Sequence, residues 1–212
     1  MQSGRALQTL AALVAASIWL TIIAATQSGA EPAAEDAPNS APPAAATTVA
    51  ESGDLFAPIA TVLRHPRCMN CHPRDDHPRQ GEDRHIHQMN VQRGPDNMGF
   101  VNERCYACHR DENNAYSGVP GAPNWHLAPL SMGWEGLDNA ALCAALLDKD
   151  KNGGRDVAQL VAHMAHDKLV LWGWAPGGTR EPVPVPHAQF VKSLQAWQAA
   201  GAPCPSPGPG KP

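Results

Sequence analysis

Apolar residues recur with the spacing of an α-helix in four stretches of this chain. In the first, Phe56, Ile59 and Val62 lie three positions apart and Leu55 and Leu63 flank them, which is typical of an amphipathic helix. No convincing pair of β-strands is apparent. The pattern therefore predicts a mainly α fold. The predicted helices cover residues 54–63, 137–147, 156–171 and 187–200.

Capping residues define two of these boundaries. Asp138 stands where an N-cap is expected and Gly201 follows the last helix, because Asp caps the first turn and Gly ends the last one. Residues 73–136 are rich in Pro, Gly, Asn and charged residues and have few apolar runs. A structureless segment of this length inside a domain requires something to organise it.

The ends of the chain differ from the middle. Residues 1–30 carry Arg5 and then an apolar run, which predicts a secretory signal peptide or, alternatively, an uncleaved N-terminal anchor. Residues 31–53 form an Ala/Pro-rich flexible tether and residues 205–212 a disordered Pro/Gly-rich tail. The folded domain is therefore expected over residues 54–204, outside the cytoplasm.

Two five-residue motifs suggest the chemistry. CMNCH occupies residues 68–72 and CYACH occupies residues 105–109, and C-x-x-C-H is the attachment signature of c-type haem. Two thiols at this spacing reach the two vinyl groups of one porphyrin, and the following histidine ligates the iron from below. The sequence therefore predicts two covalently bound haem c groups. The predicted binding residues are Cys68, Cys71, His72, Cys105, Cys108 and His109.

Three other interpretations use the same cysteines. A thioredoxin-like redox pair needs a neighbouring βαβ unit, and none is predicted here. A zinc site with all four motif cysteines has suitable ligand chemistry, but it leaves His72 and His109 without a role. Two disulfides within the motifs are the third alternative. The two remaining cysteines, Cys143 and Cys204, are expected to pair in an oxidising compartment, the alternative being two buried thiols.

The residues around the first motif resemble class I cytochromes c. Residues 55–72 are similar to the N-terminal helix and haem attachment of that family, and residues 190–203 are similar to its C-terminal helix. The resemblance implies cytochrome c-like helices that cross and shield a haem, with long irregular loops around a second one. Phrases such as HPRCMNCHP and WGWAPG also resemble small exported dihaem proteins described as subunits of isoquinoline 1-oxidoreductase-type molybdenum hydroxylases.

Each iron needs a sixth ligand or an open position. His87 lies between the two motifs, and His163 lies beside the apolar stripe of its helix, so we expect these two to be the distal ligands. Met132 and Met89 are their rivals. The choice matters because Met/His ligation raises the reduction potential relative to two histidines.

The function expected from these features is electron transfer. The chain carries 16 Lys and Arg against 20 Asp and Glu, so no basic excess indicates nucleic acid. We expect a periplasmic dihaem cytochrome between a dehydrogenase, such as a molybdenum hydroxylase, and the respiratory chain. Redox partners would dock weakly, and membrane contact would involve only an uncleaved N-terminal segment. The alternatives are a haem enzyme with one open iron site, acting on peroxide or a small nitrogen or sulfur species, and a sensor or assembly subunit. No separate catalytic residues are predicted.

Overall fold

The computed structural model describes residues 55–207. The predicted leader at 1–30, the predicted tether at 31–53 and the end of the predicted tail at 208–212 lie outside the described residues. The described part is mainly α-helical, as the sequence predicts. None of its helices has the length and apolar character needed to cross a membrane.

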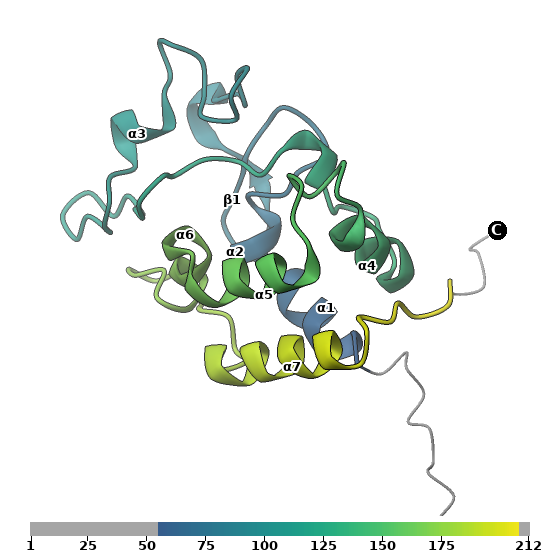
Figure 1. Ribbon diagram of the computed structural model, residues 1–212. Helices are drawn as coiled ribbons and strands as arrows, with labels where there is room; N and C mark the ends of the chain where they lie inside the picture. Colours follow the sequence, from purple (N-terminus) through teal and green to yellow (C-terminus); the bar gives the residue numbers. More distant parts are fainter. Residues whose placement is uncertain (1–54, 208–212) are drawn as a thin grey trace, which may run out of the picture. The chain divides into compact units, whose positions relative to one another are not determined.

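The elements follow one another in the order seen in Figure 1. The α-helices are α1 (Ala57–Leu63), α2 (Pro66–Met69), α3 (Cys105–Cys108), α4 (Asn139–Leu147), α5 (Val157–His166), α6 (Lys168–Leu171) and α7 (His187–Ala199). The short 3-10 helices are η1 (Gln88–Asn90), η2 (Leu130–Met132) and η3 (Trp172–Trp174). The strands β1 (Arg79–Gln80) and β2 (His85–Ile86) pair antiparallel, with Arg79 opposite Ile86.

The main core lies between α1, α4, α5 and α7, and α7 packs against both α1 and α5 (Figure 1). Phe56 and Trp197 are fully buried there, with ring centres 5.7 Å apart. The Trp197 indole N–H donates to the carbonyl of Pro203 at 2.9 Å, which satisfies its only polar group. The helical spacing of apolar residues therefore identifies this core correctly.

Two sequence predictions about secondary structure are wrong. The helix predicted over 156–171 is divided into α5 and α6 by Asp167, whose backbone is extended. The Asp167 carboxylate accepts from the backbone N–H of Leu169 at 2.8 Å, so a local side-chain bond caps α6 in place of continued helix. The pair β1–β2, which was not predicted, is too short to show an alternating pattern in the sequence.

The middle of the chain is held by polar contacts. No residue from 70–131 is among the buried members of the main core. Instead, Arg93 is 5% exposed and its guanidinium donates to the backbone carbonyls of Asp75 and Ala128 and to the side chain of Asn97. One buried cation therefore joins three parts of the irregular segment, which confirms its predicted lack of long helices.

Cys143 and Cys204 are joined by a disulfide, 61 positions apart in the sequence. Cys143 is fully buried on α4, and Cys204 lies in the segment that follows α7. The bond ties α4 to the end of the described chain.

We expect the double substitution Cys143→Ala/Cys204→Ala to lower the free energy of unfolding by about 2–4 kcal/mol, because the unfolded chain regains the entropy of a long open loop. Urea denaturation of the holoprotein measures this difference. Reduced wild-type protein should unfold at nearly the same urea concentration as the variant. A peptide map of unreduced protein that shows two separate thiols would contradict the pairing.

Candidate functional site

Each C-x-x-C-H motif folds as a single helical turn. In the first, the backbone N–H of Cys71 donates to the carbonyl of Cys68 at 3.2 Å. In the second, Cys105 and Cys108 begin and end α3. Residues three apart in a helical turn share one face. Each motif therefore presents its two thiols on the same side.

The histidine of the first motif is held on three sides. The Nδ1 atom of His72 lies 2.8 Å from the carbonyl oxygen of Met132, and the backbone N–H of Trp134 donates to the His72 carbonyl at 3.0 Å. The Trp134 ring stacks on the imidazole with centres 3.4 Å apart. Between them, a Cβ on Gly133 would lie 2.8 Å from the carbonyl oxygen of Pro73, so only glycine fits. A carbonyl only accepts, so Nδ1 carries the proton and Nε2 is left as a free acceptor.

The second motif repeats this arrangement with different residues. The Nδ1 atom of His109 lies 2.7 Å from the carbonyl oxygen of Pro120. The Trp125 ring stacks on the imidazole with centres 4.5 Å apart and planes 2° from parallel. A Cβ on Gly121 would overlap the carbonyl oxygens of two residues of the neighbouring loop. Both motif histidines are therefore oriented by a carbonyl and a tryptophan, as imidazoles that bind a metal through Nε2 commonly are.

A cavity opens beside the first motif. It holds about 1050 Å³ of empty space, counting the part that is open to solvent. Its wall combines the first motif with apolar side chains of the main core. Among the residues that line it are Val62, Leu63, Cys68, Cys71, His72, Leu146, Leu160, Met164 and Phe190. A large planar apolar ligand attached to the two thiols would be shielded here by the core helices.

Burial keeps the groups of the first motif uncharged. It raises the pKa of the Cys68 thiol to about 12 and that of Cys71 to about 11. The same burial lowers the pKa of His72 to about 3, against the opposing effect of the Met132 carbonyl. His72 is therefore a neutral imidazole throughout the physiological pH range, which is the form that ligates a metal.

His87 faces the histidine of the second motif. The ring centres of His87 and His109 are 6.0 Å apart with planes at 71°. Two imidazoles bound to opposite sides of one metal ion have centres about 6.3 Å apart, because each metal–nitrogen bond is about 2.0–2.1 Å and each nitrogen lies about 1.1 Å from its ring centre. The Nδ1 atom of His87 lies 2.6 Å from the carbonyl oxygen of Gln88, which leaves its Nε2 free as well. The pair thus fits a haem iron with two histidine ligands.

His163 lies in the cavity of the first motif. It is on α5, and its Nδ1 atom is 3.4 Å from a carboxylate oxygen of Asp167. Burial lowers the pKa of His163, with a smaller opposing effect of Asp167. His126 lines the same cavity, and it is a second candidate that the sequence did not single out. Its only signal was its position directly after Trp125.

The two methionine rivals do not fit the sixth positions. Because the Met132 carbonyl accepts from Nδ1 of His72, its backbone lies on the opposite side of that ring from Nε2. A methionine side chain is too short to pass the ring and the iron and reach the far face. Met89 is 82% exposed and therefore solvated. His87 and His163 remain the predicted distal ligands.

The alternative uses of the motif cysteines find no geometric support. In the part of the chain that the structure describes, no three or more His, Cys, Asp or Glu side chains gather as a set of metal-ion ligands. Cys68, Cys71, Cys105 and Cys108 are not joined in disulfides. The four-cysteine zinc site and the two motif disulfides are therefore not formed in this structure.

Tryptophan rings connect the two motifs. Trp125, which stacks on His109, meets Trp172 edge-on with ring centres 4.9 Å apart. Trp172 lines the cavity of the first motif. Its indole N–H donates to the side chain of Asn113 at 2.9 Å, and the same Asn113 oxygen accepts from the backbone N–H of Gly121. The surroundings of the two motifs are therefore one packed unit.

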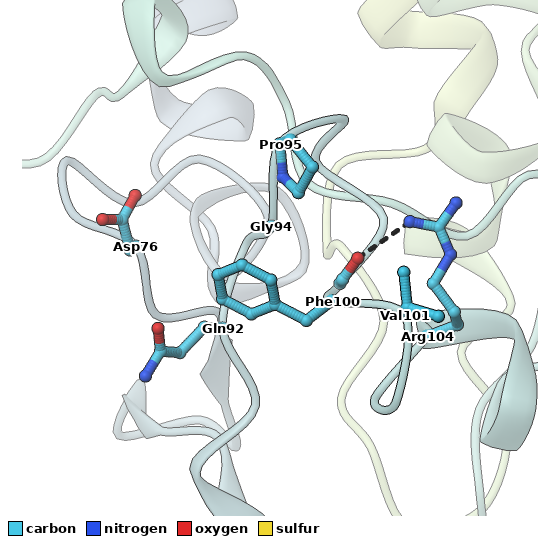
Figure 2. Close-up of a pocket in the computed structure, with 8 residues that line it drawn as sticks. Asp76, Gln92, Gly94, Pro95, Phe100, Val101 and Arg104 are labelled. Atoms are coloured by element: carbon cyan, nitrogen blue, oxygen red, sulfur yellow. Dashed lines mark hydrogen bonds between the residues drawn. The ribbon is translucent and has the colours of Figure 1, made fainter.

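A second hollow lies beside the loop before α3. Figure 2 shows Phe100 and Val101 on its wall, with Arg104 donating to the Gly99 carbonyl at 2.8 Å. Asp76, Gln92 and Pro95 complete much of its lining (Figure 2). None of the predicted binding residues lines this hollow, so it is separate from both motifs.

Comparison of the chain with protein families, with curated proteins and with solved structures finds no match. The geometry of the two motifs therefore supplies the argument for function.

We expect His163→Ala to convert the haem of the first motif from low-spin to high-spin, because the iron loses a strong-field ligand. Electron paramagnetic resonance of the oxidised holoprotein measures the change. His166→Ala is the matched control, since His166 is an exposed residue of the same helix. An unchanged spectrum for His163→Ala, with a high-spin signal for His126→Ala, would identify His126 as the ligand in its place.

Proposed function

We propose that this protein is an exported dihaem c-type cytochrome that transfers electrons. The observation that carries the proposal is the repeated arrangement at the two motifs. Each combines two cysteines on one helical turn with a histidine whose Nδ1 is bound by a backbone carbonyl and whose ring is stacked on tryptophan. A single C-x-x-C-H can occur by chance, but chance does not supply the same supporting contacts twice.

The residues of the chain have distinct roles in this proposal. Cys68 and Cys71 would hold one haem and Cys105 and Cys108 the other, each through thioether bonds. A bound haem iron supplies one-electron chemistry by cycling between the ferric and ferrous states. The carbonyls of Met132 and Pro120 keep each motif histidine neutral and correctly turned. This leaves His163 and His87 for the opposite faces.

The same proposal covers location and partners. An N-terminal leader and the Cys143–Cys204 disulfide both favour an oxidising compartment, which we take to be the periplasm, with a tether to the inner membrane if the leader is retained. The donor would be a dehydrogenase such as a molybdenum hydroxylase, and the acceptor a component of the respiratory chain. Such redox encounters bury little surface and are transient.

The test is to mature the full chain in a host with cytochrome c biogenesis. We expect two covalent haems by intact mass, a c-type reduced spectrum and two low-spin irons. Folded but colourless protein would refute the proposal. Rapid binding of carbon monoxide or cyanide at one iron would instead favour the haem enzyme with an open site.

A further inference from the structure

Arg67 is a buried cation inside the cavity of the first motif. It precedes Cys68 directly and lines the cavity with Cys68, Cys71 and His72. Its side chain is 3% exposed. The guanidinium carbon lies 5.9 Å from the centre of the Trp172 ring. The charge therefore belongs to the interior of the site and not to the solvated surface.

The hydrogen-bonding capacity of Arg67 is not used up by the described residues. Its Nη2 atom contacts the Glu82 carboxylate, whose side chain is 44% exposed. Its Nε atom is buried and has no hydrogen-bond partner among residues 55–207. Arginine has five N–H donors and stays charged in proteins. An unsatisfied donor on a buried charge is costly, so a further acceptor is expected.

A second guanidinium adds to the positive charge. Arg180 is close enough for Arg67 to lower its pKa by repulsion, although burial has the larger effect. Arg180 donates to the backbone carbonyls of Gly118 and Gly177 and forms no ion pair in the described residues. Two cations thus share one carboxylate, Glu82, and the surroundings favour another anion.

We propose that the Arg67 guanidinium, through its free Nε–H, binds a propionate carboxylate of the haem attached to Cys68 and Cys71. The inference rests on the proposed function, which supplies the haem. Guanidinium and carboxylate make strong charge-assisted hydrogen bonds. A cation beside the haem disfavours the ferric state, which carries one more positive charge than the ferrous state. Arg67 therefore raises the reduction potential of this haem.

The experiment is a redox titration of the holoprotein followed by electron paramagnetic resonance, which separates the two irons. We expect Arg67→Gln to lower the potential of the haem ligated by His72 and to leave the other nearly unchanged. Arg67→Lys, which keeps the charge but loses Nε, should give a smaller shift in the same direction. It also serves if Arg67→Gln does not assemble. Arg64→Gln, which removes an exposed arginine at the end of α1, is the control and should shift neither potential.

Two further arms separate the sources of the effect. If Arg67 served only to pair with Glu82, Glu82→Gln would lower the potential as Arg67→Gln does, whereas we expect removal of this negative charge to raise it. If the anion were a free ion, the wild-type potential would depend on inorganic phosphate, and we expect no dependence. Unchanged potentials in Arg67→Gln with both haems attached would overturn the inference alone. Missing haem in the wild type would overturn the proposed function.

Discussion

Replacing both thiols of the first motif, Cys68→Ala/Cys71→Ala, is expected to remove one of two covalent haems and to lower the free energy of unfolding by at least about 3–5 kcal/mol, the cost of deleting a large buried side chain. The cavity beside these thiols is walled by Leu63, Leu146 and Phe190, which belong to the main core. Without the haem, this apolar wall faces water. Intact mass measures the attachment, and urea denaturation measures the stability.

The second motif provides a matched control for that experiment. Cys105→Ala/Cys108→Ala also removes one haem, but Cys108 is exposed and no residue of 70–131 is a buried member of the main core. We expect a smaller loss of global stability and increased hydrogen exchange confined to the middle segment. Equal destabilisation by the two double variants would show that the core does not depend on the first haem. Retention of both haems in either variant would contradict the attachment sites.

Replacing His87 with alanine is expected to make the haem of the second motif high-spin and open to carbon monoxide. His87 faces His109 at 6.0 Å between ring centres, the spacing of two imidazoles on one iron. Loss of this ligand leaves water or an empty position, which cannot maintain the low-spin state. Electron paramagnetic resonance and carbon monoxide difference spectra report the change, while Cys105 and Cys108 keep the haem attached.

His85→Ala is the control for this substitution. His85 is exposed, lies two residues away and pairs with Asp83 at 2.6 Å. Its replacement should leave both irons low-spin. A low-spin spectrum for His87→Ala would show that another group ligates that iron. A high-spin signal in both variants would indicate that the β1–β2 hairpin, and not His87 itself, supports the site.

The helices of the main core were predictable because their signals are local. The apolar spacing around Phe56 and the capping carboxylate of Asp138, which accepts from Ala141 at 2.7 Å, act within one or two turns. The same local logic failed at Asp167. An aspartate inside an apolar pattern can either continue a helix or cap a new one, and the packing of α6 decides between them.

The candidate site divides in the same way. The motif cysteines and histidines follow from spacing alone, because two thiols and an imidazole must reach one porphyrin from a single turn. The partners of those histidines do not. Trp134 and the Met132 carbonyl approach His72 from about 60 positions away along the chain, a distance over which no periodicity operates.

By itself, the sequence determined which residues can attach haem, where the core helices lie and that the middle of the chain has no apolar framework of its own. The tertiary structure alone decided that His87 faces His109, that His126 joins His163 in the first cavity and that Arg67 is buried with a free donor. The reason is that attachment and helix formation depend on neighbours along the chain. Axial ligation and charge burial depend on segments that meet only after folding.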